Sequence, residues 1–295
     1  MILITGTSGF IGKHLLSAVI KEYGSENIVA LTSTPVSDCR YLIHNNYHFE
    51  NDYFLKNDCS QIHTIIHAGA FTPKNGKQAN YWKQSNSNII NTDKLLTAEL
   101  PELRKVIYLS TLDVYGNCDV ITEQSPISPV SLYGDSKYYC EKMVTVWSNA
   151  TNKLSQVLRV GHVYGPGEEI YEKLIPVTMR RLIEGKPIQL WGTGEETRAF
   201  IFIKDVIKAI LASLHLEDSP GPINIVSDQT IHVRGLIDKI IDISGLTPTL
   251  EKIPMASAAR SLRFDSSKMK KYLLPAELPL YDGLVEEWNH MKSIV

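Results

Sequence analysis

The chain has 295 residues, of which 43% are hydrophobic and 21% charged, and its formal net charge is −2. This length allows one large domain or two closely joined ones, and the composition is ordinary for a globular protein. A charge so close to zero excludes a global field for nucleic acid or an anionic membrane, so any anionic ligand must be held by a local site. No apolar run approaches the roughly 20 residues that span a bilayer.

The cysteines are spread along the chain without a C-x-x-C pair, at Cys39, Cys59, Cys118 and Cys140. Their low density predicts free thiols in a reducing compartment rather than a disulfide scaffold or a zinc site. The N-terminal stretch is apolar but reaches glycine almost at once and has no basic leader. We therefore expect a strand there rather than a signal peptide, and a cytoplasmic protein without a bound metal.

The first half of the chain alternates short apolar runs with longer amphipathic stretches. The predicted strands are Met1–Thr5, Asn27–Thr32, His63–Ala68, Lys105–Ser110 and Ser155–Val160. The predicted helices are about Gly9–Tyr23, Trp82–Glu99 and Ser136–Asn149. Strands and helices in alternation predict an α/β fold with a doubly wound parallel sheet and helices on both faces.

From about Gly165 the predicted elements become shorter and richer in proline, which indicates a smaller second domain. We expect a dinucleotide-binding domain over residues 1–163 and a smaller C-terminal α/β substrate domain over residues 164–295. A segment near residues 199–226 is expected to return to the first domain.

Three glycines, Gly6, Gly9 and Gly12, follow the first predicted strand in a G-x-x-G-x-x-G pattern. A helix that starts directly after a strand presents free N–H groups and a partial positive charge, which suits a phosphate. Glycines allow a tight turn, a close approach of the ligand and close packing of the helix on the strand. The pattern predicts a dinucleotide site, although its first step is one residue longer than in the usual fingerprint. The alternative is a glycine turn without a ligand.

The end of the second predicted strand bears on the choice of cofactor. An acid there would accept hydrogen bonds from the adenosine ribose, but this chain has Thr32, Ser33 and Thr34. Without a carboxylate a 2′-phosphate is not repelled. The sequence therefore favours NADP, with NAD as the alternative.

The stretch LYGDSKYYCEK places Tyr133 and Lys137 four residues apart, on one face of a helix. A free tyrosine has a pKa near ~10, and a nearby ammonium lowers it by stabilising the phenolate. The pair therefore suits acid/base exchange between an alcohol and a carbonyl. Upstream, Thr111 ends a strand, where its hydroxyl can donate to the oxygen that Tyr133 protonates. The alternatives are a surface i,i+4 pair and a structural threonine.

Several motifs occur together in a fixed order along the chain. After the glycine turn come HAGA at His67–Ala70, Asn88 in SNIINTDKLL, STLDVYG at Ser110–Gly116, Tyr133-x-x-x-Lys137, LRVGHVYGPG at Leu158–Gly167 and RAFIFIKDV at Arg198–Val206. In this order they resemble the extended branch of the short-chain dehydrogenase/reductase superfamily, the nucleotide-sugar epimerases, dehydratases and reductases. The resemblance covers nearly the whole chain and implies a Rossmann-type fold, an enzyme and a nucleotide-sugar substrate.

The resemblance implies a role for each matching residue. The implied catalytic set is Thr111, Tyr133 and Lys137. With Thr32 and Ser33 added, the cofactor set is Gly6, Gly9, Phe10, Ile11, Gly12, Thr32, Ser33, Asp52, Ala68, Gly69, Ala70, Asn88, Tyr133 and Lys137, in which Asp52 would contact the adenine. The substrate set is Thr72, Asp113, His162, Arg198 and Arg260. In this set Arg198 suits a diphosphate, because a guanidinium has forked donors.

Three departures from the family pattern affect the expected activity. Dehydratases of this branch carry T-D-E before V-Y-G, whereas this chain has Thr111, Leu112 and Asp113. Leu112 cannot be the acid that protonates a leaving hydroxyl, so dehydration is disfavoured. His162 stands where asparagine is common. The substrate domain is short, as in the compact 4-keto-sugar reductases.

The sequence thus predicts reduction of a 4-keto-6-deoxy sugar nucleotide by NADPH, with Tyr133 as the proton donor. The alternatives are a nucleotide-sugar C4 epimerase with tightly bound NAD, a 4,6-dehydratase, and a non-catalytic NAD(P)-binding regulator. The predicted helices 82–99 and 136–149 resemble those that form a four-helix dimer interface in this branch. We therefore expect a homodimer, with no nucleic-acid or membrane partner.

Overall fold

The strand that precedes the glycine turn, β1 (Ile2–Thr5), lies inside a seven-stranded sheet in the computed structural model, which describes residues 1–116, 118–254 and 261–295. The strand order is β11-β6-β5-β4-β1-β2-β3. The other strands are β2 (Ile28–Thr32), β3 (Arg40–Ile43), β4 (Thr64–His67), β5 (Lys105–Thr111), β6 (Leu154–Val160) and β11 (Ile223–Ile225). From β3 to β6 every neighbouring pair is parallel, which confirms the predicted doubly wound parallel sheet.

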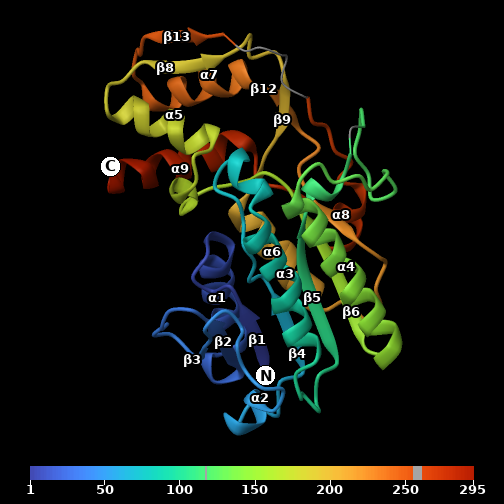
Figure 1. The fold of residues 1–295 in the computed structure, drawn as a ribbon. Coiled ribbons are helices and arrows are strands. Elements are labelled where there is room, and N and C mark those ends of the chain that lie inside the picture. Colours follow the sequence, from blue (N-terminus) through green and yellow to red (C-terminus); the bar gives the residue numbers. More distant parts are fainter. Residues whose placement is uncertain (117, 255–260) are drawn as a thin grey trace. The chain divides into compact units, whose positions relative to one another are not determined.

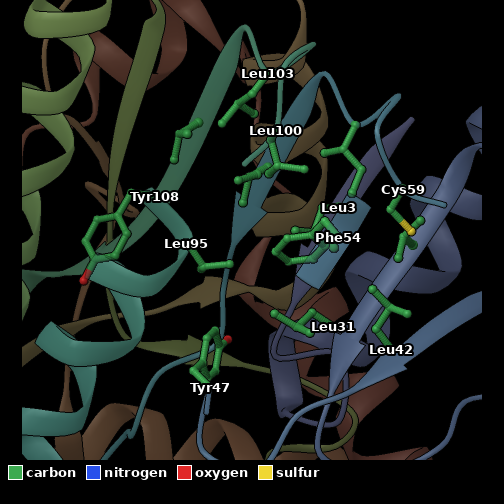
Figure 2. Packing of buried hydrophobic residues seen from close by; sticks show 14 of the residues in the cluster. Leu3, Leu31, Leu42, Tyr47, Phe54, Cys59, Leu95, Leu100, Leu103 and Tyr108 are labelled. Atoms are coloured by element: carbon green, nitrogen blue, oxygen red, sulfur yellow. The ribbon is translucent and has the colours of Figure 1, made fainter. Parts of the chain in front are cut away.

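Helices cover both faces of this sheet, since every residue of β1, β2 and β4 is buried. The helix α1 (Phe10–Tyr23) packs on β1 and β2, while α3 (Trp82–Leu96) and α4 (Leu132–Thr151) lie side by side (Figure 1). Figure 2 shows the apolar cluster on the α3 side of the sheet, which joins Leu3 and Leu31 to Leu95 and to Phe54 of α2 (Tyr53–Lys56). This cluster anchors the strands whose carboxyl ends carry the predicted site.

Two elements of this part differ from the sequence prediction. The helix that carries Tyr133 begins at Leu132, earlier than the predicted Ser136, because Ser131 caps it by accepting a hydrogen bond from Gly134 N at 3.1 Å. The edge strand β3 was not predicted, because Leu42 is its only buried residue and no alternation marks it.

The contacts between residues divide the chain into two units. The first comprises residues 1–116, 126–160 and 207–223, and the second comprises the described residues of 117–125, 161–206 and 224–295. The boundary falls within α6 (Ile203–Leu214) and within β11. The assignment of one part to the cofactor and the other to the substrate stays a prediction.

The strands of the second unit are short. Its strands pair two by two as β10-β7, β12-β9 and β13-β8, and only β12-β9 is antiparallel. The elements are β7 (Val163–Tyr164), α5 (Leu174–Ile183), β8 (Ile188–Trp191), β9 (Thr197–Ala199), β10 (Ile201–Phe202), β12 (Thr230–His232), α7 (Val233–Ser244), β13 (Leu250–Ile253), α8 (Ser267–Tyr272) and α9 (Leu280–Ile294). The predicted α/β class with a smaller C-terminal part is therefore confirmed. In the described part of the chain, no helix has the length and apolar character needed to cross a membrane.

A buried carboxyl group on α9 makes the stability of the protein depend on pH. Glu287 is fully buried, and among the described residues neither of its carboxylate oxygens has a hydrogen-bond partner. Burial first, and then the charges of Glu168 and Glu169, raise the pKa of Glu287 from 4.5 to about 8. The folded protein therefore holds this proton more tightly than the unfolded chain does. The contribution of Glu287 to the free energy of unfolding is fully present below pH 4.5 and is lost as the pH rises to about 8.

The substitution Glu287→Gln keeps the shape of the neutral acid but cannot ionise. We expect it to raise the free energy of unfolding near pH 8 by a few kcal/mol, because each pKa unit is worth about 1.4 kcal/mol, and to have little effect at acidic pH. Urea unfolding at both pH values measures the difference. The matched control is Glu286→Gln on the same helix, where the carboxylate is half-exposed beside Lys204. A gain of equal size at both pH values would contradict the buried acid.

Candidate active site

The turn after β1 depends on close contacts that only glycine permits. Gly6 has a left-handed φ of +74°, and a Cβ there would lie 2.6 Å from Gly69 Cα. A Cβ on Gly12 would lie 1.9 Å from Gly6 O, so the first turn of α1 packs directly on the backbone of this loop. Gly9 N donates to Gly6 O at 3.0 Å, and the helix begins at the next residue, Phe10. The first amides of α1 therefore follow a tight turn, the geometry that suits a phosphate.

The end of β4 lies against this turn. Thr5 Oγ1 accepts a hydrogen bond from Gly69 N at 2.8 Å and lies 2.8 Å from His67 Nδ1, while His67 Nε2 lies 3.2 Å from Thr92 Oγ1. Burial and, to a smaller extent, the charge of Lys137 lower the pKa of His67 to about 3. The imidazole is therefore neutral at physiological pH. One of its hydrogen bonds links β4 to β1 and the other links β4 to α3.

The residues of the turn fit the pyrophosphate of a dinucleotide. The packing of Gly12 on Gly6 leaves no room for a side chain, and Thr7 Oγ1 is buried without a hydrogen-bond partner among the described residues. An unsatisfied buried hydroxyl is costly, so a polar ligand at this turn would relieve it. The amides of Gly9, Phe10 and Ile11 are the groups that would hold the phosphates.

Two other predicted cofactor residues have local roles in this structure. Thr32 is buried, and its hydroxyl donates to Thr34 O at 2.9 Å, so of the predicted pair only Ser33 is exposed. Asp52 pairs with Lys56 at 2.7 Å at the start of α2. The neighbouring Asn51 O accepts from Glu99 N, beyond the C-terminal end of α3. Asp52 Oδ1 is buried without a hydrogen-bond partner among the described residues, and its contact with the adenine stays a prediction.

Tyr47 lies beside the glycine turn, although the sequence analysis did not include it among the cofactor residues. Its φ of +56° is left-handed, and its ring lies 4.3 Å from that of His44. A Cβ on Gly69 would lie 2.6 Å from Tyr47 Oη, which places the phenol beside the glycine turn. Two consecutive asparagines before Tyr47 were the available signal, because asparagine favours the left-handed turn that directs this ring inward.

The predicted catalytic residues lie on two elements that are in close contact, the end of β5 with the turn after it and the start of α4. Thr111 ends β5 and caps the short turn Leu112–Val114, with its Oγ1 accepting from Asp113 N at 3.2 Å. A Cβ on Gly134 would lie 2.4 Å from Asp113 O, so the first turn of α4 packs on the residues that follow Thr111. Tyr133, next to Gly134, is 6% exposed and its ring lies edge-on to Phe71.

Lys137 lies one turn further along α4 and is only 3% exposed. Its Nζ donates to Leu109 O at 2.6 Å and lies 4.3 Å from the centre of the Tyr108 ring. Burial lowers the pKa of Lys137 to about 8, while Cys140 and Glu141 act in the opposite direction. A lysine buried in this way affects a neighbouring phenol strongly, because little water screens its charge.

Asn88 of α3 connects the end of β4 to the catalytic helix. Its Oδ1 accepts from Phe71 N at 2.7 Å, and its Nδ2 donates to Ser136 Oγ at 3.2 Å. The structure thus brings together a large part of the predicted set in the first unit: Gly6, Gly9, Phe10, Ile11, Gly12, Ala68, Gly69, Ala70, Asn88, Thr111, Tyr133 and Lys137. Their roles stay predictions.

The predicted substrate residues are divided between the two units. Thr72 and Asp113 are exposed side chains of the first unit. His162 and Arg198 belong to the second, where burial, and then the charges of Lys173 and Arg198, lower the pKa of His162 to about 4. Arg198 donates to Thr197 O at 3.0 Å. Arg260 lies outside the described residues.

The parallel sheet and the glycine turn after β1 define a Rossmann-like α/β fold. The profile of the NAD dependent epimerase/dehydratase family matches residues 2–226. The chain belongs to this family, which confirms the predicted resemblance and the prediction of an enzyme.

Some of the relatives that match the chain are named as epimerases, and others are named as dehydratases. An uncharacterized UDP-glucose epimerase of Bacillus subtilis is 27% identical over 99% of this chain and 98% of its own length. A trifunctional enzyme of Arabidopsis thaliana, whose name includes UDP-glucose 4,6-dehydratase, is 29% identical over 83% of this chain, which spans only 39% of that enzyme. The crystal structure of UDP-glucuronic acid 4-epimerase from Bacillus cereus with UDP-glucuronic acid and NAD has a TM-score of 0.85 and 25% identity, covering 100% of this chain and 99% of its own.

Proposed function

We propose that this protein is a nucleotide-sugar C4 epimerase that works with a tightly held NAD. The observation that carries the proposal is the turn after β5. Asp113 of this turn packs on the first turn of the helix that carries Tyr133 and Lys137. Leu112, which the resemblance aligns with the acid of dehydratases, is an apolar residue and only 8% exposed. The relatives that match this chain over its whole length and theirs include epimerases. These comparisons favour epimerisation over the net reduction that the sequence predicts first.

The second observation concerns the cofactor. The sequence favours NADP because hydroxyls replace an acid at the end of β2, but the hydroxyl of Thr32 is engaged with Thr34. The epimerase of Bacillus cereus was crystallised with NAD. We therefore propose NAD as the cofactor of this chain.

The proposed chemistry assigns one step to each residue of the catalytic set. The phenolate of Tyr133 accepts the proton of the sugar 4-hydroxyl, and Thr111 donates a hydrogen bond to the same oxygen. The charge of Lys137 stabilises the phenolate. NAD supplies the acceptor and donor of the C4 hydride. Once the keto-sugar has rotated to present its opposite face, the hydride would return to C4 from that side, and Tyr133 gives the proton back to the C4 oxygen.

The substrate we propose is a UDP-hexose such as UDP-glucose or UDP-glucuronic acid. Arg198 supplies forked donors for the diphosphate, and Thr72, Asp113 and His162 are the candidates for the sugar. Exposed apolar side chains of α3 and α4, namely Trp82, Tyr139 and Val146, support the predicted homodimer.

We expect the purified protein to contain NAD and to interconvert UDP-glucose and UDP-galactose, or UDP-glucuronate and UDP-galacturonate, without added cofactor. Denaturation followed by chromatography measures the released nucleotide, and the same method follows the sugar products. Stoichiometric NADPH oxidation with a 4-keto-6-deoxy sugar nucleotide would instead establish the reductase. Formation of a 4-keto-6-deoxy product from UDP-glucose would establish a dehydratase. Either result would contradict the proposal.

A further inference from the structure

A buried ion pair joins Glu141 of α4, the helix that carries Tyr133 and Lys137, to Arg159 of β6. Arg159 Nε donates to Glu141 Oε1 at 3.0 Å and Arg159 Nη2 donates to Glu141 Oε2 at 2.7 Å, which makes the pair bidentate. Both side chains are 5% exposed. Neither residue belongs to the catalytic, cofactor or substrate sets assigned above.

Two hydroxyl groups complete this network. Ser110 Oγ donates to Glu141 Oε1, and Arg159 Nη1 donates to Tyr115 Oη at 2.7 Å. The guanidinium carbon of Arg159 also lies 4.9 Å from the centre of the Tyr115 ring. Ser110 is 5% exposed and Tyr115 is 2% exposed, so all of these contacts are shielded from water.

Stability alone does not explain such a network. Desolvation of two charges offsets most of their attraction, and apolar side chains of similar volume often stabilise a core as well. A bidentate pair instead fixes direction, because the two parallel hydrogen bonds tolerate little rotation. A buried ion pair therefore selects one placement of α4 on the sheet.

Three members of the network lie next to a group of the proposed site. Ser110 directly precedes Thr111, and Glu141 follows Lys137 by one helical turn. Tyr115 ends the turn that Thr111 begins, and its amide donates to Leu112 O at 3.0 Å. The contacts thus bind the strand end, the turn and the helix that carry Thr111, Tyr133 and Lys137.

We propose that the Glu141–Arg159 pair, held by Ser110 and Tyr115, is the positioning element of the active site and fixes α4 against β5 and β6 in the catalytic arrangement. This inference rests on the proposed function, because it assigns the network to the alignment of Tyr133 and Lys137 with Thr111. It also gives the two adjacent hydroxyls of Ser110 and Thr111 different tasks: Ser110 binds Glu141, and Thr111 is left for the substrate.

The carboxylate of Glu141 has a second effect on the site. The titratable groups that face Lys137 are Cys140 and Glu141 from α4, Tyr108 from β5 and His67 from β4. Among these, Cys140 and then the Glu141 carboxylate favour the ammonium form of Lys137. The pair therefore positions Lys137 and helps to keep it charged.

Two single-group deletions test the positioning role without leaving a buried charge unpaired. Ser110→Ala removes the hydrogen bond to Glu141, and Tyr115→Phe removes the one to Arg159. We expect each to lower kcat by about 10- to 100-fold with unchanged KM and NAD content, because a small misplacement of catalytic groups has that cost. The matched control is Ser148→Ala, which deletes a hydrogen bond to Lys153 O at the far end of α4 and should leave kcat unchanged.

A third variant, Glu141→Gln, separates positioning from charge. Loss of the carboxylate lowers the pKa of Lys137, so the limb of the kcat–pH profile that reports Lys137 should move to lower pH. The variant also leaves the Arg159 guanidinium without its partner, so we expect a lower melting temperature as well. A limb that stays at the wild-type pH would contradict the effect of the Glu141 charge on Lys137.

The results distinguish this inference from the proposed function. If Tyr133→Phe abolishes turnover while both Ser110→Ala and Tyr115→Phe keep the wild-type kcat, the positioning role is overturned and the proposed function stands. If Ser148→Ala lowers kcat as much as they do, the effect belongs to the helix in general and the inference is again overturned. If Tyr133→Phe retains full turnover, the proposed function itself fails.

Discussion

Replacement of Tyr133 by phenylalanine is expected to lower kcat by about 10²- to 10⁴-fold, the range that general acid–base catalysis contributes. The substitution removes one oxygen and keeps the ring, which is buried and lies edge-on to Phe71. The helix cap at Ser131 and the contact of Gly134 with Asp113 do not involve the phenol oxygen. NAD content and melting temperature should therefore stay at wild-type values while epimerisation is lost.

The matched control for this prediction is Tyr139→Phe on the same helix, where the side chain is 50% exposed. Turnover with UDP-glucose, bound NAD and melting temperature are measured for both variants side by side. We expect the wild-type rate for Tyr139→Phe. A loss of rate in both variants, or in neither, would remove Tyr133 from its proposed role.

The sequence predicted the parts of the site that lie in regular local patterns. The apolar run Ile2–Thr5 and the glycines after it define β1 and the start of α1, and the spacing of Tyr133 and Lys137 places both on α4. The start of this helix was predicted too late, since Gly134 and the preceding prolines are poor helix formers and the cap by Ser131 decides the boundary.

The contacts that depend on distant parts of the chain could not be predicted in this way. From the sequence, Arg159 is one residue of a predicted strand, and a glutamate such as Glu141 is expected on the exposed face of its helix. In the structure both side chains are buried and form an ion pair. The inward turn of Tyr47 and the hydrogen bond of Thr32 to Thr34 depend on backbone angles that no periodicity encodes. The adenine contact of Asp52 is implied by the resemblance alone and stays a prediction.

Replacement of Gly12 by alanine is expected to prevent the enzyme from retaining its cofactor. The new Cβ would lie 1.9 Å from Gly6 O, 2.7 Å from Gly6 C and 2.9 Å from Thr7 Cα, all of them backbone atoms. Because the backbone of the turn cannot rotate away as a side chain would, α1 has to move off β1. We expect a loss of about 1–3 kcal/mol in the free energy of unfolding, as for other overpacked sites, and protein that purifies without NAD.

The matched control is Gly235→Ala, the same change inside α7, where a Cβ would meet only Ile231 Cγ1 at an ordinary 3.7 Å. Alanine is the better helix former, so this variant should gain up to about 1 kcal/mol and keep its NAD. Urea unfolding and the nucleotide content of the purified proteins measure both effects. Wild-type NAD content and stability in Gly12→Ala would mean that the turn has space for a Cβ. That result would contradict the proposed binding of the pyrophosphate by the first amides of α1.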